Sequence, residues 1–225
     1  MARPLVIAHR GASACETENS LLAFRRALEM GADGIELDVH ATADGNLVVH
    51  HDPDLNGRHL ARLSLEDARR LRLPNGEALP TLSEALALIT PAAIAFVELK
   101  TLPATADDAL FTVFDHAPHP ERCQVHSFDH RIIRRLTLAR PALPAGVLSG
   151  AYAVDPAAEV HAAGATALWQ HEERVDRPLA ALLHDAGLAL YVWTVDRPER
   201  MKRLVADGVD GICTNCPDVA REVVQ

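Results

Sequence analysis

Four polar clusters in the sequence hold residue types that can do chemistry, and each follows or ends a short β-branched run. They are His9-Arg10, Glu36-Leu-Asp38, His51-Asp52 and Glu98-Leu-Lys100. Because side chains alternate along a strand, Glu36 and Asp38 share one face, as do Glu98 and Lys100. Three carboxylates at one point repel one another unless a cation binds them, and oxygen ligands select a hard ion such as Mg2+ or Ca2+. Ion pairing with Arg10 and Lys100, without a metal, is the alternative.

Two histidines, His9 and His51, belong to the same clusters. Imidazole is accessible in both its neutral and protonated forms near pH 7, so a pair can serve as base and acid. The guanidinium of Arg10 has a fork of donors suited to phosphate oxygens, and Lys100 adds a point charge. A metal ion, two cations and two histidines together suit phosphodiester cleavage. Each signal is weak alone, and only the joint placement at strand ends is specific.

The elements that must hold these residues alternate along the chain. Short β-branched runs predict nine strands, at Leu5–Ala8, Gly34–Val39, Leu47–His50, Ile94–Leu99, Cys123–Phe128, Gly146–Leu148, Ala167–Gln170, Leu190–Val195 and Gly211–Thr214. Apolar residues at helical spacing predict helices between most of them, at Ser20–Met30, Ser64–Leu71, Leu82–Ile89, Asp129–Ala139, Pro178–Ala186 and Pro198–Ala206. This alternation indicates an α/β fold with a parallel sheet.

Nine strands are one too many for an eight-stranded barrel, and the third strand explains the excess. No helix fits between the second and third strands, where Asp44-Gly45 is a strong hairpin-turn signal. The sequence therefore predicts a (β/α)8 TIM barrel with a β-hairpin arm after the second strand. A turn centred between Asp44 and Gly45 pairs residues whose numbers add to 89, which places Asp38 opposite His51. His51 then lies at the carboxyl end of the barrel, where barrel enzymes keep their sites.

The composition describes an ordinary globular chain of 225 residues, with 48% hydrophobic and 24% charged residues. No linker rich in Pro, Gly or Ser divides it, which predicts a single domain over residues 1–225. The net charge of −9 argues against a nucleic-acid partner, and no apolar run is long enough for membrane insertion or a signal peptide, which predicts a cytoplasmic protein. The Cys213 and Cys216 pair lacks the further ligands of a zinc site and is interpreted as ordinary thiols.

The sequence resembles the glycerophosphodiester phosphodiesterase family, in its short bacterial cytoplasmic form. The resemblance runs in order through nearly the whole chain. The segments that carry it are Ala8-His-Arg-Gly11, Glu18-Asn-Ser20, Gly31-Ala-Asp-Gly-Ile-Glu-Leu-Asp-Val39, Thr42-Ala-Asp-Gly45, Val48-Val-His-His-Asp-Pro53, Val97-Glu-Leu-Lys100, Ser127-Phe-Asp129, Val192-Trp-Thr-Val195 and Gly208-Val-Asp-Gly-Ile-Cys-Thr214. The most specific part is the combination of the HR motif (His9-Arg10), the ExD motif (Glu36-Leu-Asp38) and the HD motif (His51-Asp52).

The resemblance implies a barrel of the PLC-like phosphodiesterase type and a division of labour within it. Glu36, Asp38 and Glu98 are expected to hold one divalent cation, Mg2+ or Ca2+, with Mn2+ as a further option. His9 and His51 are expected to form the acid/base pair. These roles come from the family pattern and match the chemistry that the residue types suggest.

The same resemblance implies that Arg10 anchors the phosphate, that Lys100 lies near it, and that Trp193 lines the alcohol side of the substrate. One departure concerns the segment after the HD motif. Many members have a longer segment or a small inserted subdomain there, whereas only 45 residues separate Asp52 from Glu98 in this chain. We therefore expect a reduced cover over the substrate, with an effect on selectivity and none on catalysis.

Three neighbouring residues have two interpretations each. Asn19 either contacts the site or caps the helix that follows it. Glu18 either supports the site or favours the positive start of the same helix. Asp52 is interpreted as a residue that orients His51 or caps its loop, and not as a metal ligand.

Together these observations predict metal-dependent hydrolysis of glycerophosphodiesters to sn-glycerol 3-phosphate and an alcohol, by two-histidine acid/base catalysis. The expected partner is a small-molecule glycerophosphodiester, and the oligomeric state stays open. One alternative is a lysophospholipase-D-like or other phosphodiesterase on the same scaffold. The other is a non-catalytic barrel that binds phosphorylated ligands.

Overall fold

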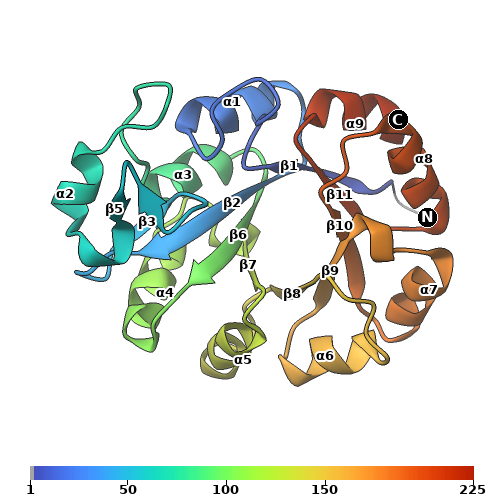
Figure 1. Cartoon of the computed structure of the whole chain (residues 1–225). Helices are drawn as coiled ribbons and strands as arrows, with labels where there is room; N and C mark the ends of the chain where they lie inside the picture. Colours follow the sequence, from blue (N-terminus) through green and yellow to red (C-terminus); the bar gives the residue numbers. More distant parts are fainter. Residues whose placement is uncertain (1–2) are drawn as a thin grey trace.

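Within residues 3–225, which the computed structural model describes, eight parallel strands close into a barrel (Figure 1). Closure comes from the first strand, which pairs with both the second and the last. In order around the barrel the strands are β1 (Leu5–His9), β2 (Gly34–Ala41), β6 (Ile94–Thr101), β7 (Cys123–Ser127), β8 (Ala145–Ser149), β9 (Ala167–His171), β10 (Ala189–Trp193) and β11 (Gly211–Thr214). The predicted (β/α)8 barrel is confirmed, and each predicted strand end lies within two residues of the observed one.

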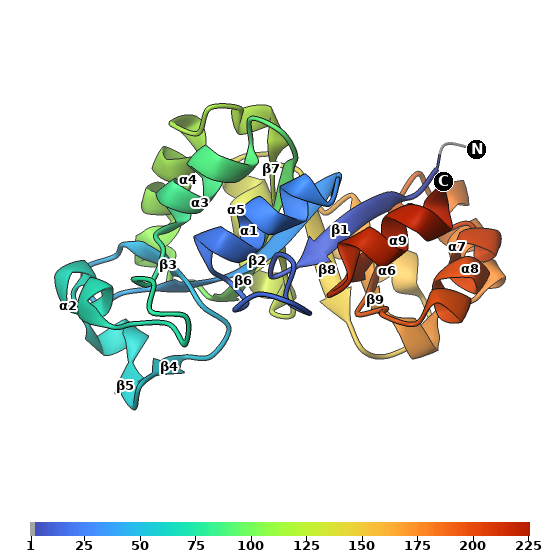
Figure 2. The same cartoon turned by 90° about the horizontal axis from the view of Figure 1, so that it is seen from above.

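Helices pack around the outside of the barrel (Figures 1 and 2). They are α1 (Leu21–Glu29), α3 (Leu82–Ile89), α4 (Asp107–Asp115), α5 (His130–Ala139), α6 (Pro156–Ala162), α7 (Arg177–Asp185), α8 (Pro198–Asp207) and α9 (Pro217–Val224). The sequence did not predict α4, α6 or α9. The first two bury only two residues each, Leu110 and Phe114 in α4 and Pro156 and Val160 in α6, so their apolar period is weak.

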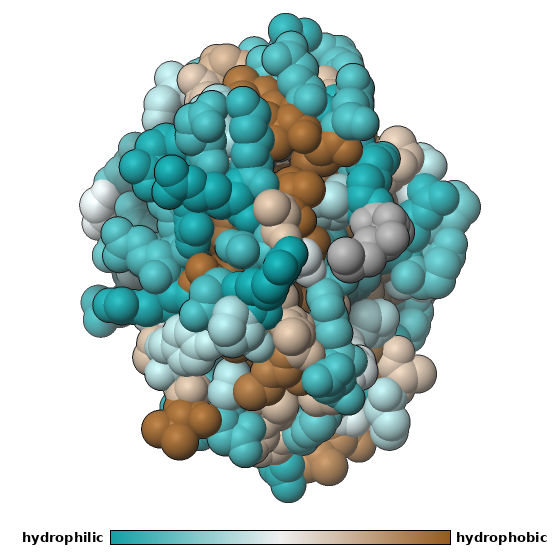
Figure 3. All heavy atoms as spheres, turned by 90° about the vertical axis from the view of Figure 1, so that its right-hand side faces the viewer, coloured by the Kyte–Doolittle hydropathy of each residue, from teal (hydrophilic) through white to brown (hydrophobic). Residues whose placement is uncertain are grey.

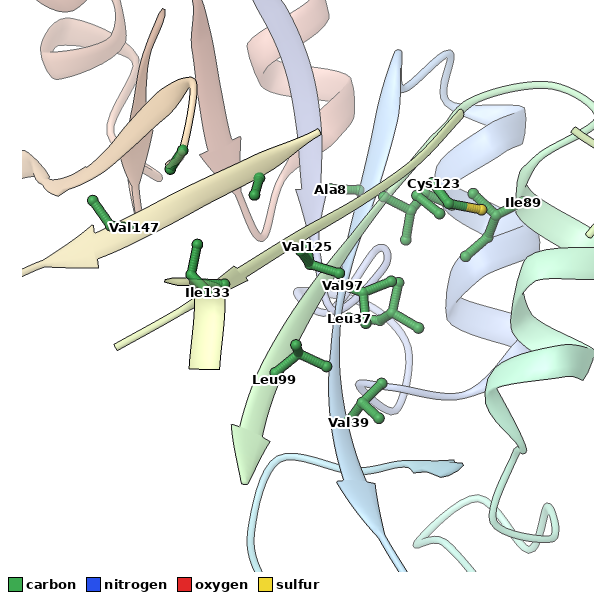
Figure 4. Close-up of a cluster of buried hydrophobic side chains, with 14 of the residues drawn as sticks. Ala8, Leu37, Val39, Ile89, Val97, Leu99, Cys123, Val125, Ile133 and Val147 are labelled. Carbon is green, nitrogen blue, oxygen red and sulfur yellow. The ribbon is translucent and has the colours of Figure 1, made fainter. Parts of the chain in front are cut away.

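The main apolar core lies between the barrel strands and these helices. Leu37 and Val39 of β2 point outward beside Val97 and Leu99 of β6, and helix side chains such as Ile89 complete the layer (Figure 4). The alternate positions of the same strands point into the barrel. This two-residue period explains why β2 and β6 carry apolar side chains on one face and carboxylates on the other.

The lower part of the barrel interior is filled by apolar side chains. They are Ile7, Phe96, Leu148, Trp169 and Cys213, all buried. The rings of Phe96 and Trp169 meet edge to face with their centroids 5.1 Å apart. This packed floor closes the barrel from below, so the polar side chains above it can be reached only from the carboxyl end.

The hairpin arm is present, but its predicted register is wrong by one residue. The strand β3 (Leu47–Val49) runs antiparallel to β2, and Val39 pairs with Val49. His50 therefore lies opposite Asp38, and its amide donates to the Asp38 carbonyl at 3.0 Å. The reason is the loop: the Thr42 amide donates to the Asn46 carbonyl, so three residues form the turn where the prediction assumed two, and Gly45 takes a positive φ of 79°.

The segment after the hairpin forms a small unit beside the barrel mouth, distant from α7 and α8 (Figures 1 and 2). It contains β4 (Asp54–Leu55), β5 (Arg58–His59), a 3-10 turn at Leu60–Arg62 and α2 (Leu65–Arg70). Its own apolar cluster is made of Val48, Leu55, Leu60, Leu63, Ala68, Leu73 and Leu79. This cluster ties the segment that follows the HD motif to the hairpin arm.

The outer surface is mixed in character. The face that carries α7, α8 and α9 is mainly hydrophilic, with apolar side chains in a narrow strip from the top towards the centre and in smaller spots elsewhere (Figure 3). Across residues 3–225, no helix combines the length and the apolarity that crossing a bilayer requires.

Candidate active site

A pocket of about 140 Å3 opens at the carboxyl end of the barrel. Seven of the eight residues that the sequence singled out line it: His9, Arg10, Glu36, His51, Glu98, Lys100 and Trp193. The eighth, Asp38, is fully buried and touches both Arg10 and Lys100. The barrel topology thus brings together residues that lie up to 184 positions apart in the sequence.

His9 ends β1 and is held by a chain of hydrogen bonds from the end of the neighbouring strand β11. Its Nδ1 lies 2.8 Å from Oδ1 of Asn215, whose Nδ2 donates to Asp196 at 2.7 Å. An amide oxygen can only accept, so the hydrogen of the neutral ring is on Nδ1 and Nε2 faces the pocket. Burial, assisted by the positive charge of Arg10, lowers the pKa of His9. Asn215 and Asp196 were not predicted, although Asn215 directly follows the strand β11.

His51 is held in a similar way from the hairpin arm. Its Nδ1 lies 2.8 Å from Oδ1 of Asp52, which supports the expected orienting role of Asp52. The carbonyl of His51 accepts a hydrogen bond from Nε2 of His40 at 3.0 Å, and Nδ1 of His40 contacts the Thr101 hydroxyl at 3.3 Å. The buried His40 ring therefore links the ends of β2 and β6 to the His51 backbone, a connection that the sequence did not predict.

The three carboxylates differ in their surroundings. Burial raises the pKa of Glu36 well above its ordinary value, and repulsion from Asp38 and Glu98 adds to this. Burial and the charge of Asp38 likewise raise the pKa of Glu98, although its Oε1 lies 2.7 Å from Nζ of Lys100. For Asp38 burial acts in the same direction, but Arg10 and Lys100 prevail and lower its pKa. Arg10 and Lys100 therefore offset the negative charge of Asp38, but they do not offset that of Glu36.

Asp38 is the best-paired carboxylate of the three. Its Oδ2 lies 3.0 Å from Nε of Arg10 and accepts a hydrogen bond from Nδ2 of Asn19 at 2.8 Å. Asn19 therefore contacts the site, and the helix cap that was its alternative role belongs to Ser20. The guanidinium of Arg10 also donates to both oxygens of Glu18 at 3.0 Å, so Glu18 supports the site as well.

The unpaired oxygens test whether the site fits a divalent cation. Oε1 of Glu36 and Oδ1 of Asp38 are buried and make no hydrogen bond within residues 3–225. Ligand atoms of Glu36, Glu98 and His126 all lie within 4.8 Å of one another. Buried anionic oxygens without partners are costly, and a hard cation removes that cost. The ion pairing that was weighed as the alternative is present at Asp38 and Glu98, but it leaves Oε1 of Glu36 without a partner.

A glycine is required where Arg10 turns into the pocket. Arg10 and Gly11 both have positive φ angles, 56° and 84°. A Cβ on Gly11 would lie 2.7 Å from the backbone carbon of Ala23, closer than any real contact. The tight turn brings the Arg10 amide within 3.1 Å of Oε2 of Glu36. Gly11 therefore allows the turn that places Arg10, just after β1, against Glu36 of β2.

The opposite side of the pocket is aromatic. Trp193, at the end of β10, donates its indole hydrogen to the carbonyl of Trp169 at 3.0 Å. Phe128 meets Trp193 edge to face with the centroids 5.4 Å apart, and it is half exposed. The pocket therefore has one charged wall and one apolar wall, which suits a ligand with an anionic group and an organic substituent.

A larger, open hollow of about 820 Å3 adjoins this pocket and shares Lys100 with it. Its arginines are already paired, since Arg135 binds Asp107 through two nitrogens and Arg131 binds Asp129. The unpaired groups are concentrated in the smaller pocket, which is therefore the candidate active site.

Comparison with known proteins agrees with this geometry. Residues 9–219 match the family described as "Glycerophosphoryl diester phosphodiesterase family". A curated glycerophosphodiester phosphodiesterase of Caldanaerobacter subterraneus subsp. tengcongensis is 34% identical over 99% of this chain and 98% of its own length. Solved glycerophosphodiester phosphodiesterases of Parabacteroides distasonis and Thermotoga maritima are 30% and 25% identical, with TM-scores of 0.88 and 0.80. Both matches cover 99% of this chain, and 97% and 98% of those chains. The barrel, the pocket at its carboxyl end and these relatives agree: the chain belongs to the glycerophosphoryl diester phosphodiesterase family.

Proposed function

We propose that this enzyme hydrolyses glycerophosphodiesters to sn-glycerol 3-phosphate and an alcohol with the help of a divalent cation. The observation that carries the proposal is the pair of histidines in one pocket. Each imidazole is held through Nδ1, His9 by Asn215 and His51 by Asp52, and each ring lines the pocket beside the carboxylate cluster. Family membership supports the same reaction class.

The two histidines supply the proton transfers. With Nδ1 bound to an acceptor, Nε2 of a neutral ring is free to take a proton from the attacking oxygen. The partner histidine, protonated, gives its proton to the oxygen of the leaving alcohol. The same pair serves whether the attacking oxygen belongs to water or to the neighbouring glycerol hydroxyl, which would give a cyclic phosphate that water then opens.

The cations of the pocket bind the phosphate. The carboxylates of Asp38 and Glu36 outweigh the effect of burial and raise the pKa of Arg10, so Arg10 keeps its charge. Asp38 and Glu98 raise the pKa of Lys100 in the same way. Both side chains line the pocket and can share the negative charge of the phosphoryl oxygens. The aromatic side, formed by Trp193 and Phe128, is left for the organic substituent.

Glu36, Asp38 and Glu98 are the proposed ligands of the cation, Mg2+ or Ca2+ with Mn2+ as a further option. Bound there, the ion would neutralise the carboxylates and polarise the phosphoryl oxygens. The support for this is Oε1 of Glu36, which is buried without a hydrogen-bond partner within residues 3–225, together with the raised pKa of Glu36.

The test is release of sn-glycerol 3-phosphate from glycerophosphocholine by the full chain, after chelation and after Mg2+, Ca2+ or Mn2+ is restored. We expect release to vanish with chelator and return with a cation, and His9→Ala or His51→Ala to lower kcat by about 10²–10⁴-fold. Binding of the diester without turnover at saturating metal would instead indicate a non-catalytic barrel. Full activity in His51→Ala would contradict the roles of the pair.

Lysophosphatidylcholine is the second substrate to assay. The half-exposed ring of Phe128 stands at the mouth beside Trp193 and offers apolar contact to a bulkier substituent. A higher kcat/KM for the lysolipid than for glycerophosphocholine would favour the lysophospholipase-D-like alternative.

A further inference from the structure

One buried imidazole in the pocket has no part in the reaction described above. His126 lies on β7, where it is in register with Glu98 of β6, and its side chain is 1% exposed. Its Nε2 is 3.8 Å from Oε1 of Glu36, the carboxylate oxygen that has no hydrogen-bond partner. His126 therefore faces the centre of the carboxylate cluster from the side opposite Arg10 and β1.

The ring of His126 is held by packing alone. It stacks on the indole of Trp169, with the centroids 4.2 Å apart and the planes at 9°. Its Nδ1 is buried and has no hydrogen-bond partner within residues 3–225. Its Nε2 is 3.8 Å from Oε1 of Glu36, which is beyond hydrogen-bond distance. Burying polar nitrogens without partners costs free energy. An ion between Nε2 and Oε1 of Glu36 would give both atoms a partner that the polypeptide does not supply.

The distances agree with a shared ion. Two ligands that bind one cation at about 2.1–2.2 Å lie about 3 Å apart when adjacent and about 4.3 Å apart when opposite. The 3.8 Å between Nε2 of His126 and Oε1 of Glu36 falls inside this range. Glu98 completes the group, because its ligand atom lies within 4.8 Å of the other two.

The carboxylate set leaves room for such a ligand. Oδ2 of Asp38 is taken by Arg10 and Asn19, and Oδ1 lies 3.4 Å from Nζ of Lys100. Oε1 of Glu98 is taken by Lys100 as well. A nitrogen ligand would complete a set that is short of free oxygens. Among divalent ions, imidazole is a good ligand for transition metals and Zn2+ and a poor one for Ca2+ and Mg2+.

We propose that His126 ligates the divalent cation through Nε2 and makes the site a mixed nitrogen–oxygen centre that prefers Mn2+, Co2+ or Zn2+ to Ca2+. This inference rests on the proposed metal-dependent function and adds to it a ligand and a choice of metal.

Pulsed EPR of Mn2+ bound to the full chain tests the ligand directly. The wild-type protein is expected to show modulation from a nitrogen-14 nucleus of a bound imidazole, and His126→Gln is expected to lose it. His116→Gln, which changes an exposed histidine directly after the last residue of α4, is the matched control and should keep the modulation. Its absence from the wild type, or its persistence in His126→Gln, overturns the proposal.

Calorimetric titration tests the choice of metal. A glutamine at position 126 can still offer an oxygen, so His126→Gln should lower the Mn2+ and Zn2+ affinities by about 10–100-fold and change the Ca2+ affinity by less than about 3-fold. An equal loss for all ions would overturn the proposed preference. Hydrolysis of glycerophosphocholine is measured separately, so a failure of the reaction and a failure of the nitrogen ligand give different results.

Discussion

Replacing Asn215 by alanine should slow the reaction although this side chain does not line the pocket. Oδ1 of Asn215 accepts a hydrogen bond from Nδ1 of His9, and its Nδ2 donates to Asp196. An amide is needed here because one side chain must accept on one side and donate on the other. Without it, the neutral His9 ring is no longer held with Nε2 free for proton transfer.

The size of the effect follows from what is left unpaired. His9 is mostly buried, so loss of its acceptor leaves a buried N–H without a partner, at a cost of about 1–3 kcal/mol. If that cost falls on the transition state, kcat decreases by about 5–150-fold. The hydrogen bond to Asn215 also raises the pKa of His9, so the limb of the pH–rate profile that His9 controls should move to lower pH.

The assay is steady-state release of sn-glycerol 3-phosphate over a range of pH. Asn75→Ala is the control, because Asn75 lies in an exposed loop before α3 and its side chain, among residues 3–225, makes hydrogen bonds with Glu77 alone. KM should change little in either variant. A normal kcat in a folded Asn215→Ala protein, or a loss confined to KM, would refute the argument that Asn215 orients His9.

Three further predictions concern stability. Gly11→Ala should cost more than about 2 kcal/mol, because a Cβ at a φ of 84° meets the backbone of Ala23, and urea unfolding will measure it. Asp44 accepts hydrogen bonds from Thr42 and the Leu65 amide, which lower its pKa from 3.8 to about 2. A depressed carboxyl pKa stabilises the fold above the unfolded value, so Asp44→Asn should cost about 0.5–1.5 kcal/mol at neutral pH. That gap should close as the pH falls from 3.8 towards 2, and urea unfolding at several pH values will show whether it does. Adding a competent cation at about 100 times its Kd should stabilise the wild type by about 2.7 kcal/mol and raise Tm by roughly 5–10 °C. Glu36→Gln should lose most of that shift in a thermal melt, and an equal shift in the variant would argue against Glu36 as a ligand.

The local pattern of the sequence determined the fold class and most of the pocket. The two-residue period of β2 separates Leu37 and Val39 from Glu36 and Asp38, whatever lies around the strand. Polar residues at the ends of parallel strands meet at one edge, so seven of the eight predicted site residues line the same pocket. The hairpin register is where local reasoning failed, because the turn at Gly45 contains one residue more than the common two-residue form.

Only the tertiary structure decided which partners complete the site. His126 and Asn215 have no distinguishing local signal, since a histidine or an asparagine near a strand end is ordinary. Their roles depend on contacts across the barrel: His126 with Trp169 and Glu36, and Asn215 with His9, 206 positions away in the sequence. Strand periodicity sets which way a side chain points, but the closure of the barrel sets what it meets there.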